Sequence, residues 1–265
     1  AGLMSLSGGV VSTVVMWLLL KKANASLGVV GVCGALAHNA AITENTFAGD
    51  LFAGEGVQAD DEYNALLNLN GDGVMGMISI PKINQTIPIY HGTDDSVLQV
   101  GAGHLPGTAL PVGGENTHCV LAAHRGLPSA RLFSDIDQLE EGDMIYLHIL
   151  GEVHAYRVEN ILPMVPKDDF ETLNKALRIL HGQDWLSLMT CTPYGINTHR
   201  LLVRGRRVET PDQYKHLRVT AEALKIEPII VAPVMALPML LILLIGMLLS
   251  TRKRKKTRGE EHEKH

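Results

Sequence analysis

Short apolar runs, separated by Gly, Pro, Asn and Asp, make up the chain from residue 74 to residue 208. Several short strands at close spacing are typical of a closed barrel or a sandwich. Strands are predicted at Val74–Ile80, Ile87–Tyr90, His118–Ala123, Met144–Leu150, Ala155–Leu162, Trp185–Thr190 and His199–Val208. Short helices are predicted at Ala59–Leu69, Arg131–Leu139 and Phe170–Leu173. The pattern therefore predicts a mainly β domain, for which we take the bounds 59–227.

The longest apolar stretch, Ile229–Leu249, contains no charged residue and is followed directly by a cluster of Lys and Arg. About 20 apolar residues span the hydrocarbon core of a bilayer as a helix, and a basic cluster marks the cytoplasmic flank. We therefore expect a transmembrane helix over 228–250, a cytoplasmic basic tail over 251–265, and an extracellular domain before them. The expected location is the cell membrane.

The N-terminal region, 1–40, holds two shorter apolar runs, Gly8–Leu20 and Leu27–Ala37, with Lys21 and Lys22 between them. Each run is short for a full membrane span. A cleaved signal and a second anchor both fit this pattern.

Composition narrows the class of protein. The 265 residues carry a net charge of −5, so no general basic character points to a nucleic-acid partner. Three cysteines do not make a disulfide framework, and Cys33 falls in the N-terminal apolar region. Cys119 and Cys191 remain in the predicted domain. A free cysteine is commonly a small buried hydrophobic residue, but a leftover thiol in an exported protein is also a candidate for reactivity.

Cys191 ends one predicted strand, and the next begins after a loop rich in turn residues, 192–197. If the two strands pair antiparallel with residue 190 opposite residue 201, Cys191 faces Arg200, because directly opposed residues share a face of the sheet. A nearby guanidinium favours the thiolate form of a cysteine. The pattern therefore predicts a reactive thiol at Cys191.

His124 closes the predicted strand that begins near Thr117 and supplies a candidate base. Alternate residues of a strand share a face, so His124 shares its side with Val120 and Ala122, while Cys119 points the other way. We therefore interpret Cys119 as a structural residue of the core. His118 and His124 lack a ligand pair at spacing suited to zinc, so no metal site is expected, and no cofactor is expected either.

Around these residues, Ser187-Leu-Met-Thr-Cys191 resembles the sortase motif Thr-Leu-x-Thr-Cys, with serine in the first position. The sequence from Thr190 to Gly205 is similar to that of class C, the pilin-polymerising branch of that family. Further similar motifs are Ile80-Pro-Lys-Ile83, Pro88-Ile-Tyr-His-Gly-Thr93, Gly103-His-Leu-Pro-Gly-Thr108, Leu110-Pro-Val-Gly-Gly114 and His124-Arg-Gly-Leu-Pro128. The resemblance runs from about Tyr63 to Val208.

This resemblance implies an eight-stranded sortase β-barrel with short helices, and a transpeptidase. Cys191 would attack the Thr–Gly bond of an LPxTG-type sorting signal, and a pilin lysine would resolve the thioacyl intermediate. His124 would act as general acid and base, and Arg200 would stabilise the oxyanion. Thr190 and Ser187, from the same motif, are expected to contact substrate. The implied partners are LPxTG-bearing pilin subunits, their acceptor lysine and the lipid bilayer.

Class C sortases carry an N-terminal lid with an Asp-Pro-aromatic anchor, and Gly49-Asp-Leu-Phe-Ala-Gly54 stands in the corresponding place. Within a lid segment over 41–58, Asp50 would pair with Arg200, and Phe52 would cover Cys191. Leu51 replaces the proline and removes its fixed φ, which would loosen the lid. An ordinary acidic linker is the alternative.

Two other functions compete with pilin polymerisation. A housekeeping sortase would attach surface proteins to peptidoglycan, and a non-catalytic barrel would only bind pilins. A papain-like protease is disfavoured, because its cysteine precedes its histidine along the chain, whereas Cys191 follows His124.

Overall fold

The computed structural model describes residues 31–45, 51–53, 59–127 and 130–215. The predicted membrane helix and basic tail, most of the N-terminal apolar region and Asp50 lie outside these ranges. Within them, no helix has the length and apolar character needed to cross a bilayer.

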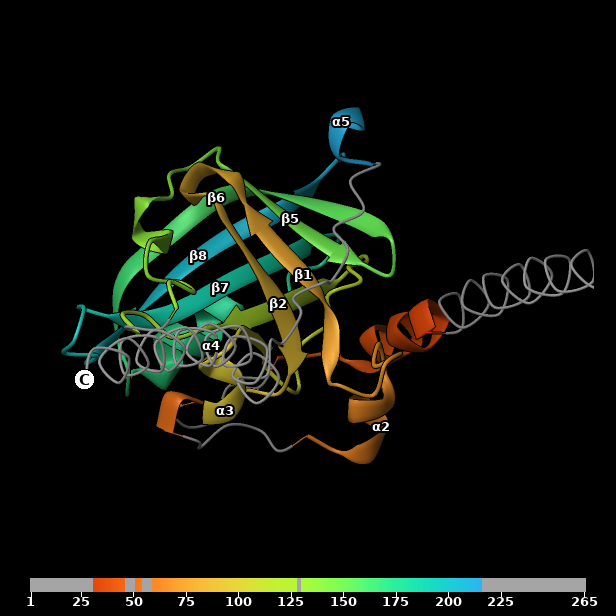
Figure 1. The fold of residues 1–265 in the computed structure, drawn as a ribbon, viewed down its shortest axis with the longest axis horizontal. Helices are drawn as coiled ribbons and strands as arrows, with labels where there is room; N and C mark the ends of the chain where they lie inside the picture. Colours follow the sequence, from red (N-terminus) through yellow and green to blue (C-terminus); the bar gives the residue numbers. More distant parts are fainter. Residues whose placement is uncertain (1–30, 46–50, 54–58, 128–129, 216–265) are drawn as a thin grey trace, which may run out of the picture. The chain divides into compact units, whose positions relative to one another are not determined.

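Eight strands form a closed barrel in the order β1-β2-β3-β4-β7-β8-β6-β5 (Figure 1). The strands are β1 Val74–Ile80, β2 Gln85–His91, β3 Ala102–His104, β4 Thr117–Ala122, β5 Met144–Ile149, β6 Glu152–Pro166, β7 Asp184–Thr192 and β8 His199–Val208. Residues 31–41 are helical. The helices that follow are η1 Leu51–Ala53, α2 Asp61–Ala65, η2 Pro81–Ile83, α3 Asp95–Leu98, η3 Ile136–Gln138, α4 Phe170–Leu177 and α5 Asp212–Lys215. The predicted mainly β barrel with short helices is confirmed.

Two neighbouring pairs in the barrel, β2–β3 and β4–β7, are parallel, and the other pairs are antiparallel. Parallel neighbours need a crossover connection. The connection from β2 to β3 carries α3, and the connection from β4 to β7 contains β5, β6 and α4. These crossovers bring α3 and α4, which are distant in sequence, to one hydrophobic cluster on the barrel wall.

Side-chain alternation divides the barrel wall into an inner and an outer face. On β4, Cys119 and Leu121 belong to the core that fills the barrel, whereas Val120 and Ala122 belong to a second cluster on the outer face. We call this second group the outer cluster, and its buried members are Leu51, Leu98, Leu105, Val120, Ala122, Val165, Leu173, Leu177, Met189 and Leu202. Because η1, α3 and α4 each contribute to it, the outer cluster attaches these elements to the barrel wall.

Strand β3 is the one strand of this barrel that the apolar pattern misses. It has three residues, of which the middle one is Gly103, it is preceded by Gly101, and glycine has low β propensity. Gly103 is required here because a Cβ atom on it would lie 2.4 Å from the carbonyl oxygen of Gly92. The close approach of β2 and β3 therefore removes the apolar signal by which strands are recognised.

The helices are also bounded differently from the expectation. Helix α2 begins at Asp61, after Asp60 accepts a hydrogen bond from the amide of Tyr63 at 2.7 Å. It ends at Ala65, well before residue 69, because Leu67 adopts a left-handed φ of 58°. The predicted helix at Arg131–Leu139 contains only the single turn η3, while α4 extends four residues beyond the predicted Phe170–Leu173.

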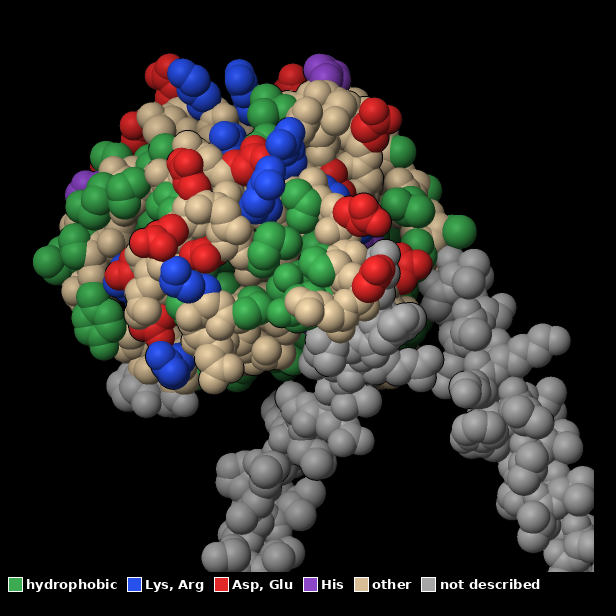
Figure 2. All heavy atoms as spheres, turned by 90° about the horizontal axis from the view of Figure 1, so that it is seen from above, with side chains coloured by type: hydrophobic (Ala, Val, Ile, Leu, Met, Phe, Trp, Pro, Cys, Tyr) green, Lys and Arg blue, Asp and Glu red, His purple; other side chains and the backbone are tan. Residues whose placement is uncertain are grey.

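Acidic, basic and apolar side chains intermingle on the face shown in Figure 2, without a large area of one charge. The ion pairs include Lys82 with Glu140 at 3.2 Å and Arg206 with Glu159 at 2.8 Å. Solvent screens these surface pairs, so they contribute little to the free energy of unfolding.

Three buried histidines make the fold sensitive to acid. Burial lowers the pKa of His104, His118 and His154 to about 4. His118 lies between the carbonyl of Arg178 (2.9 Å) and the hydroxyl of Ser187 (2.8 Å), which suits a neutral ring that donates once and accepts once. These imidazole rings are therefore neutral in the folded protein at pH 7.

We predict that the free energy of unfolding falls as the pH is lowered from 7 to 5. The folded pKa values lie below that of free histidine, so the unfolded chain binds more protons in this window. Each ring contributes a loss on the order of 1–2 kcal/mol. Asp184, whose pKa is raised by burial, offsets part of the loss.

Urea unfolding at pH 7 and pH 5 measures the effect. His154→Gln should reduce the difference between the two pH values, and the matched change at the exposed His181, His181→Gln, should leave it unchanged. If the free energy of unfolding depends on pH equally in the two variants, His154 is not a source of the acid sensitivity.

Candidate active site

Cys191 and Arg200 are directly opposite each other in the antiparallel β7–β8 pair. The register also pairs Thr190 with Leu201 and Ser187 with Arg204, as the sequence predicts. Both members of the first pair are buried, Cys191 with 5% of its surface exposed and Arg200 with 2%. Their neighbours Met189 and Leu202 belong to the outer cluster, so the thiol and the guanidinium lie on the outer face of the barrel wall.

The loop between β7 and β8 orients the guanidinium. Arg200 donates from Nη1 to the carbonyl oxygens of Asn197 (3.1 Å) and His199 (2.9 Å). The loop closes tightly because the amide of Asn197 donates to Pro193 at 3.0 Å. Gly195 takes a φ of 73°, a conformation that glycine adopts without strain. Backbone carbonyls thus hold the cation beside the cysteine.

His124 follows β4 by two residues, and its backbone is attached to β7 and to the next loop. The amide of Ala123 donates to Met189 at 3.2 Å, and the hydroxyl of Thr190 donates to the carbonyl of Ala123 at 2.8 Å. The carbonyl of His124 accepts from Phe133 at 3.2 Å. The imidazole contacts the ring of Phe52, which packs against the outer cluster, so it lies on the side of the wall that carries Val120 and Ala122, as strand parity predicts.

Phe52 lies over the same part of the wall. Its ring centroid is 5.9 Å from that of His124 and 4.9 Å from the guanidinium carbon of Arg200. The second contact is within the range of cation–π attraction. Phe52 therefore spans the two polar groups expected in the active site, and Cys191 sits next to them on β7.

Leu51 fixes η1 to the barrel. Only 1% of its surface is exposed, and it belongs to the outer cluster with Val120, Met189 and Leu202. Full burial of a leucine side chain is worth about 1.5–3 kcal/mol. The expectation that Leu51 loosens this segment considered only the lost proline constraint; the structure adds an apolar anchor. Asp50, the expected partner of Arg200, lies outside the described residues.

Asp95 is a neighbour of His124 that the sequence did not single out. Its Oδ1 lies 3.2 Å from Nε2 of His124. The residue stands in the first turn of α3, 29 positions before the histidine. An acidic residue in a polar segment gives no signal in one sequence, so only the folded arrangement reveals this contact.

Thr190 and Ser187, expected to contact substrate, are used inside the protein. Thr190 is fully buried and donates to Ala123, and Ser187 has 1% exposure and is bonded to His118. Their geometry supports structural roles in joining β7 to β4. Cys119 lies in the barrel core, and burial raises the pKa of its thiol.

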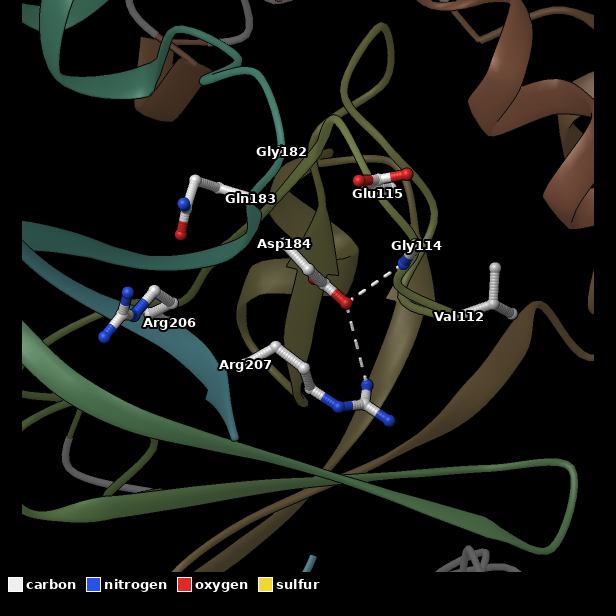
Figure 3. A pocket seen from close by; sticks show the side chains of 8 residues that line it. All are labelled: Val112, Gly114, Glu115, Gly182, Gln183, Asp184, Arg206 and Arg207. Atoms are coloured by element: carbon white, nitrogen blue, oxygen red, sulfur yellow. Dashed lines mark hydrogen bonds and ion pairs between the residues drawn. The ribbon is translucent and has the colours of Figure 1, made fainter. Parts of the chain in front are cut away.

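A cavity of about 620 Å³ lies at the other end of β7, near Asp184 (Figure 3). Asp184 accepts from the amide of Gly114 and the hydroxyl of Tyr156, each at 3.0 Å, and lies 3.9 Å from Arg207. These partners tie the loop before β4 to β7 and β8. We interpret this end as a structural network remote from Cys191. Within the described residues, no three His, Cys, Asp or Glu side chains gather closely enough to hold a metal ion.

Comparison with known proteins shows similarity to sortases over the barrel domain. A family model described as the sortase domain matches residues 78–208. Sortase A of Bacillus anthracis is 31% identical over 153 residues, which cover 58% of this chain and 69% of that protein. Sortase D of Bacillus subtilis is 32% identical over 136 residues, covering 50% of this chain; the match spans 63% of the relative's own length.

Solved structures extend the similarity. Sortase C of Streptococcus pneumoniae is 44% identical with a TM-score of 0.61, covering 71% of this chain and 90% of that one. Sortase C2 of Pilus Island 1 from Group B Streptococcus is 39% identical, also with a TM-score of 0.61, covering 71% and 98%. Barrel topology, sequence identity and coverage agree, and the chain belongs to the sortase family.

Proposed function

We propose that this protein is a cysteine transpeptidase that joins pilin subunits, with Cys191, His124 and Arg200 as its catalytic residues. The observation that carries the proposal is the pairing of Cys191 with Arg200 on the outer face of the barrel, beside His124 and under the ring of Phe52. A nearby cation favours the thiolate, which is the nucleophilic form.

In the first step, the sulfur of Cys191 attacks the threonine carbonyl of an LPxTG-type sorting signal. The oxyanion forms near Arg200, whose guanidinium supplies hydrogen-bond donors. The bond from threonine to glycine then breaks, and His124 donates the proton that the leaving amine takes. A thioacyl adduct on Cys191 remains.

In the second step, His124 removes a proton from an incoming amine, which attacks the thioester carbonyl. The carbon–sulfur bond breaks and regenerates Cys191. We propose that the amine is a pilin lysine. Support comes from the relatives: Sortase C of Streptococcus pneumoniae is described with a pilin substrate specificity, and Sortase C2 of Group B Streptococcus belongs to a pilus island.

We also propose that the protein is anchored in the cell membrane through 228–250, with its catalytic domain extracellular and the tail 251–265 cytoplasmic. The support is the uncharged run Ile229–Leu249 followed by basic residues. This orientation places the thiol on the side where surface proteins are assembled.

Phe52 and Leu51 are proposed to form the core of a lid that covers the active site at rest. Phe52 contacts both His124 and Arg200, so a sorting signal cannot reach the same surface until this ring moves. Burial of Leu51 in the outer cluster supplies the free energy that opposes opening.

The 265-residue chain incubated with a pilin carrying an LPxTG-type signal should form a thioacyl adduct on Cys191 and a lysine isopeptide between pilin copies. Mass spectrometry detects both products. Cys191→Ala should abolish them, and the matched change Cys119→Ala should retain them, because Cys119 faces the barrel core.

Other outcomes separate the alternatives. An adduct that resolves only onto peptidoglycan cross-bridge amines would indicate a housekeeping sortase. If neither product forms with any sorting signal, even when Leu51→Ala opens the lid, the transpeptidase proposal is wrong and a pilin-binding barrel takes its place.

Leu51→Ala should increase the rate at which a thiol reagent labels Cys191 by at least about tenfold. Removing a buried leucine side chain costs about 2–5 kcal/mol, and here that loss favours lid opening. Peptide mapping identifies the labelled cysteine. Asp50→Ala is expected to act in the same direction.

Leu69→Ala is the matched control, because Leu69 is 48% exposed and lies outside the outer cluster. It should label at the wild-type rate. Equal rates for Leu51→Ala and Leu69→Ala would show that η1 is an ordinary linker.

A further inference from the structure

We propose that Asp95 is a positioning residue for His124, which fixes the proton on Nε2 and leaves Nδ1 to exchange protons during the reaction. This inference rests on the proposed acid–base role of His124. It is carried by the 3.2 Å contact between Oδ1 of Asp95 and Nε2 of His124. A carboxylate accepts only, so Nε2 must donate in this contact.

The carboxylate of Asp95 is itself held in place. Its Oδ2 accepts from Nε2 of Gln99 at 2.5 Å, one turn later in the chain. The backbone carbonyl of Asp95 also accepts from the amide of Gln99 at 3.1 Å. One oxygen is thus oriented by Gln99 and the other faces His124, which fixes the angle at which the carboxylate meets the imidazole.

Helix α3, which carries Asp95, is attached to the same wall as the catalytic residues. Leu98 has 1% exposure and belongs to the outer cluster together with Ala122, two residues before His124. Packing therefore sets the distance between α3 and the end of β4. The contact of Asp95 with His124 therefore follows from the packing of α3 against β4.

The imidazole lies between groups of different character. Asp95 approaches Nε2, and the ring of Phe52 lies 5.9 Å from the imidazole, between it and Arg200. When His124 takes a proton from the thiol or the amine, a second N–H appears and the ring becomes positive. Asp95 then stabilises the positive charge of the imidazolium and also keeps the ring in its orientation. Because this contact does not involve η1, it remains when the lid opens.

The size of the effect follows from exposure. The side chain of Asp95 is 74% exposed and that of His124 is 20% exposed, so solvent screens their attraction. Pairs of this kind are worth up to about 1 kcal/mol, which corresponds to about a fivefold change in rate. Asp95 is therefore expected to tune the reaction, and its removal leaves a slower enzyme.

The test compares Asp95→Ala, Asp95→Glu and Asp94→Ala in the 265-residue chain. Asp94 is the matched control, because it precedes α3, carries the same charge and makes no side-chain capping bond. Turnover of a sorting-signal peptide gives kcat and KM. Asp95→Ala should lower kcat about fivefold at unchanged KM, Asp95→Glu should recover most of the loss, and Asp94→Ala should match the wild type.

The ring nitrogens of His124 provide a readout that does not depend on turnover. With ¹⁵N-labelled histidine at alkaline pH, where free imidazole is neutral, the signals of His124 are assigned by their loss in His124→Ala. The wild type should carry its proton on Nε2, and Asp95→Ala should shift the population toward the Nδ1-protonated tautomer.

The two readouts separate this inference from the proposed function. An unchanged tautomer population in Asp95→Ala overturns the positioning role, whether or not the wild type turns over. A changed population with kcat equal to the wild type also overturns it. If the wild type shows no transpeptidation, the proposed function fails while the ring signals still decide whether Asp95 holds His124.

Discussion

The antiparallel register of β7 and β8 is the constraint on which the site depends. It places Cys191 directly opposite Arg200, and a shift of either strand by one residue would turn that strand's side chain to the other face of the wall and separate the pair. Apolar neighbours stabilise this register, because Leu188 and Val203 fill the barrel core while Met189 and Leu202 join the outer cluster. Hydrophobic alternation on both faces thus fixes the position of a polar pair.

The outer cluster explains how distant segments meet at one surface. Three short elements, η1, α3 and α4, have too few residues to be stable alone, and each is attached through buried apolar side chains: Leu51, Leu98, Leu173 and Leu177. Two of these elements also carry groups that contact His124, namely Phe52 and Asp95. Apolar packing on the outer wall therefore positions both the cover of the site and the carboxylate beside its histidine.

The charged side chains at the two ends of β7, Asp184 and Arg200, have different kinds of contacts. Near Asp184, a partly buried carboxyl with a raised pKa accepts hydrogen bonds from an amide and a hydroxyl and lies within ion-pair distance of an arginine. Near Cys191, the guanidinium of Arg200 is held by backbone carbonyls and faces an aromatic ring that belongs to a short, separately attached segment. The first arrangement joins the loop before β4 to β6, β7 and β8, and the second is suited to a site that substrate must enter.

The sequence by itself determined the mainly β class, seven of the eight strands, the side of β4 on which His124 lies and, once residue 190 is assumed to lie opposite residue 201, the facing of Cys191 and Arg200. Those features follow from local periodicity and strand parity, which a single chain displays directly. Only the tertiary structure decided that β3 exists, that Leu51 anchors η1, that the hydroxyls of Thr190 and Ser187 are bonded to other groups of the protein, and that Asp95 meets His124. These depend on close backbone approach, burial and contacts between segments far apart in the chain, for which residue order carries no local signal.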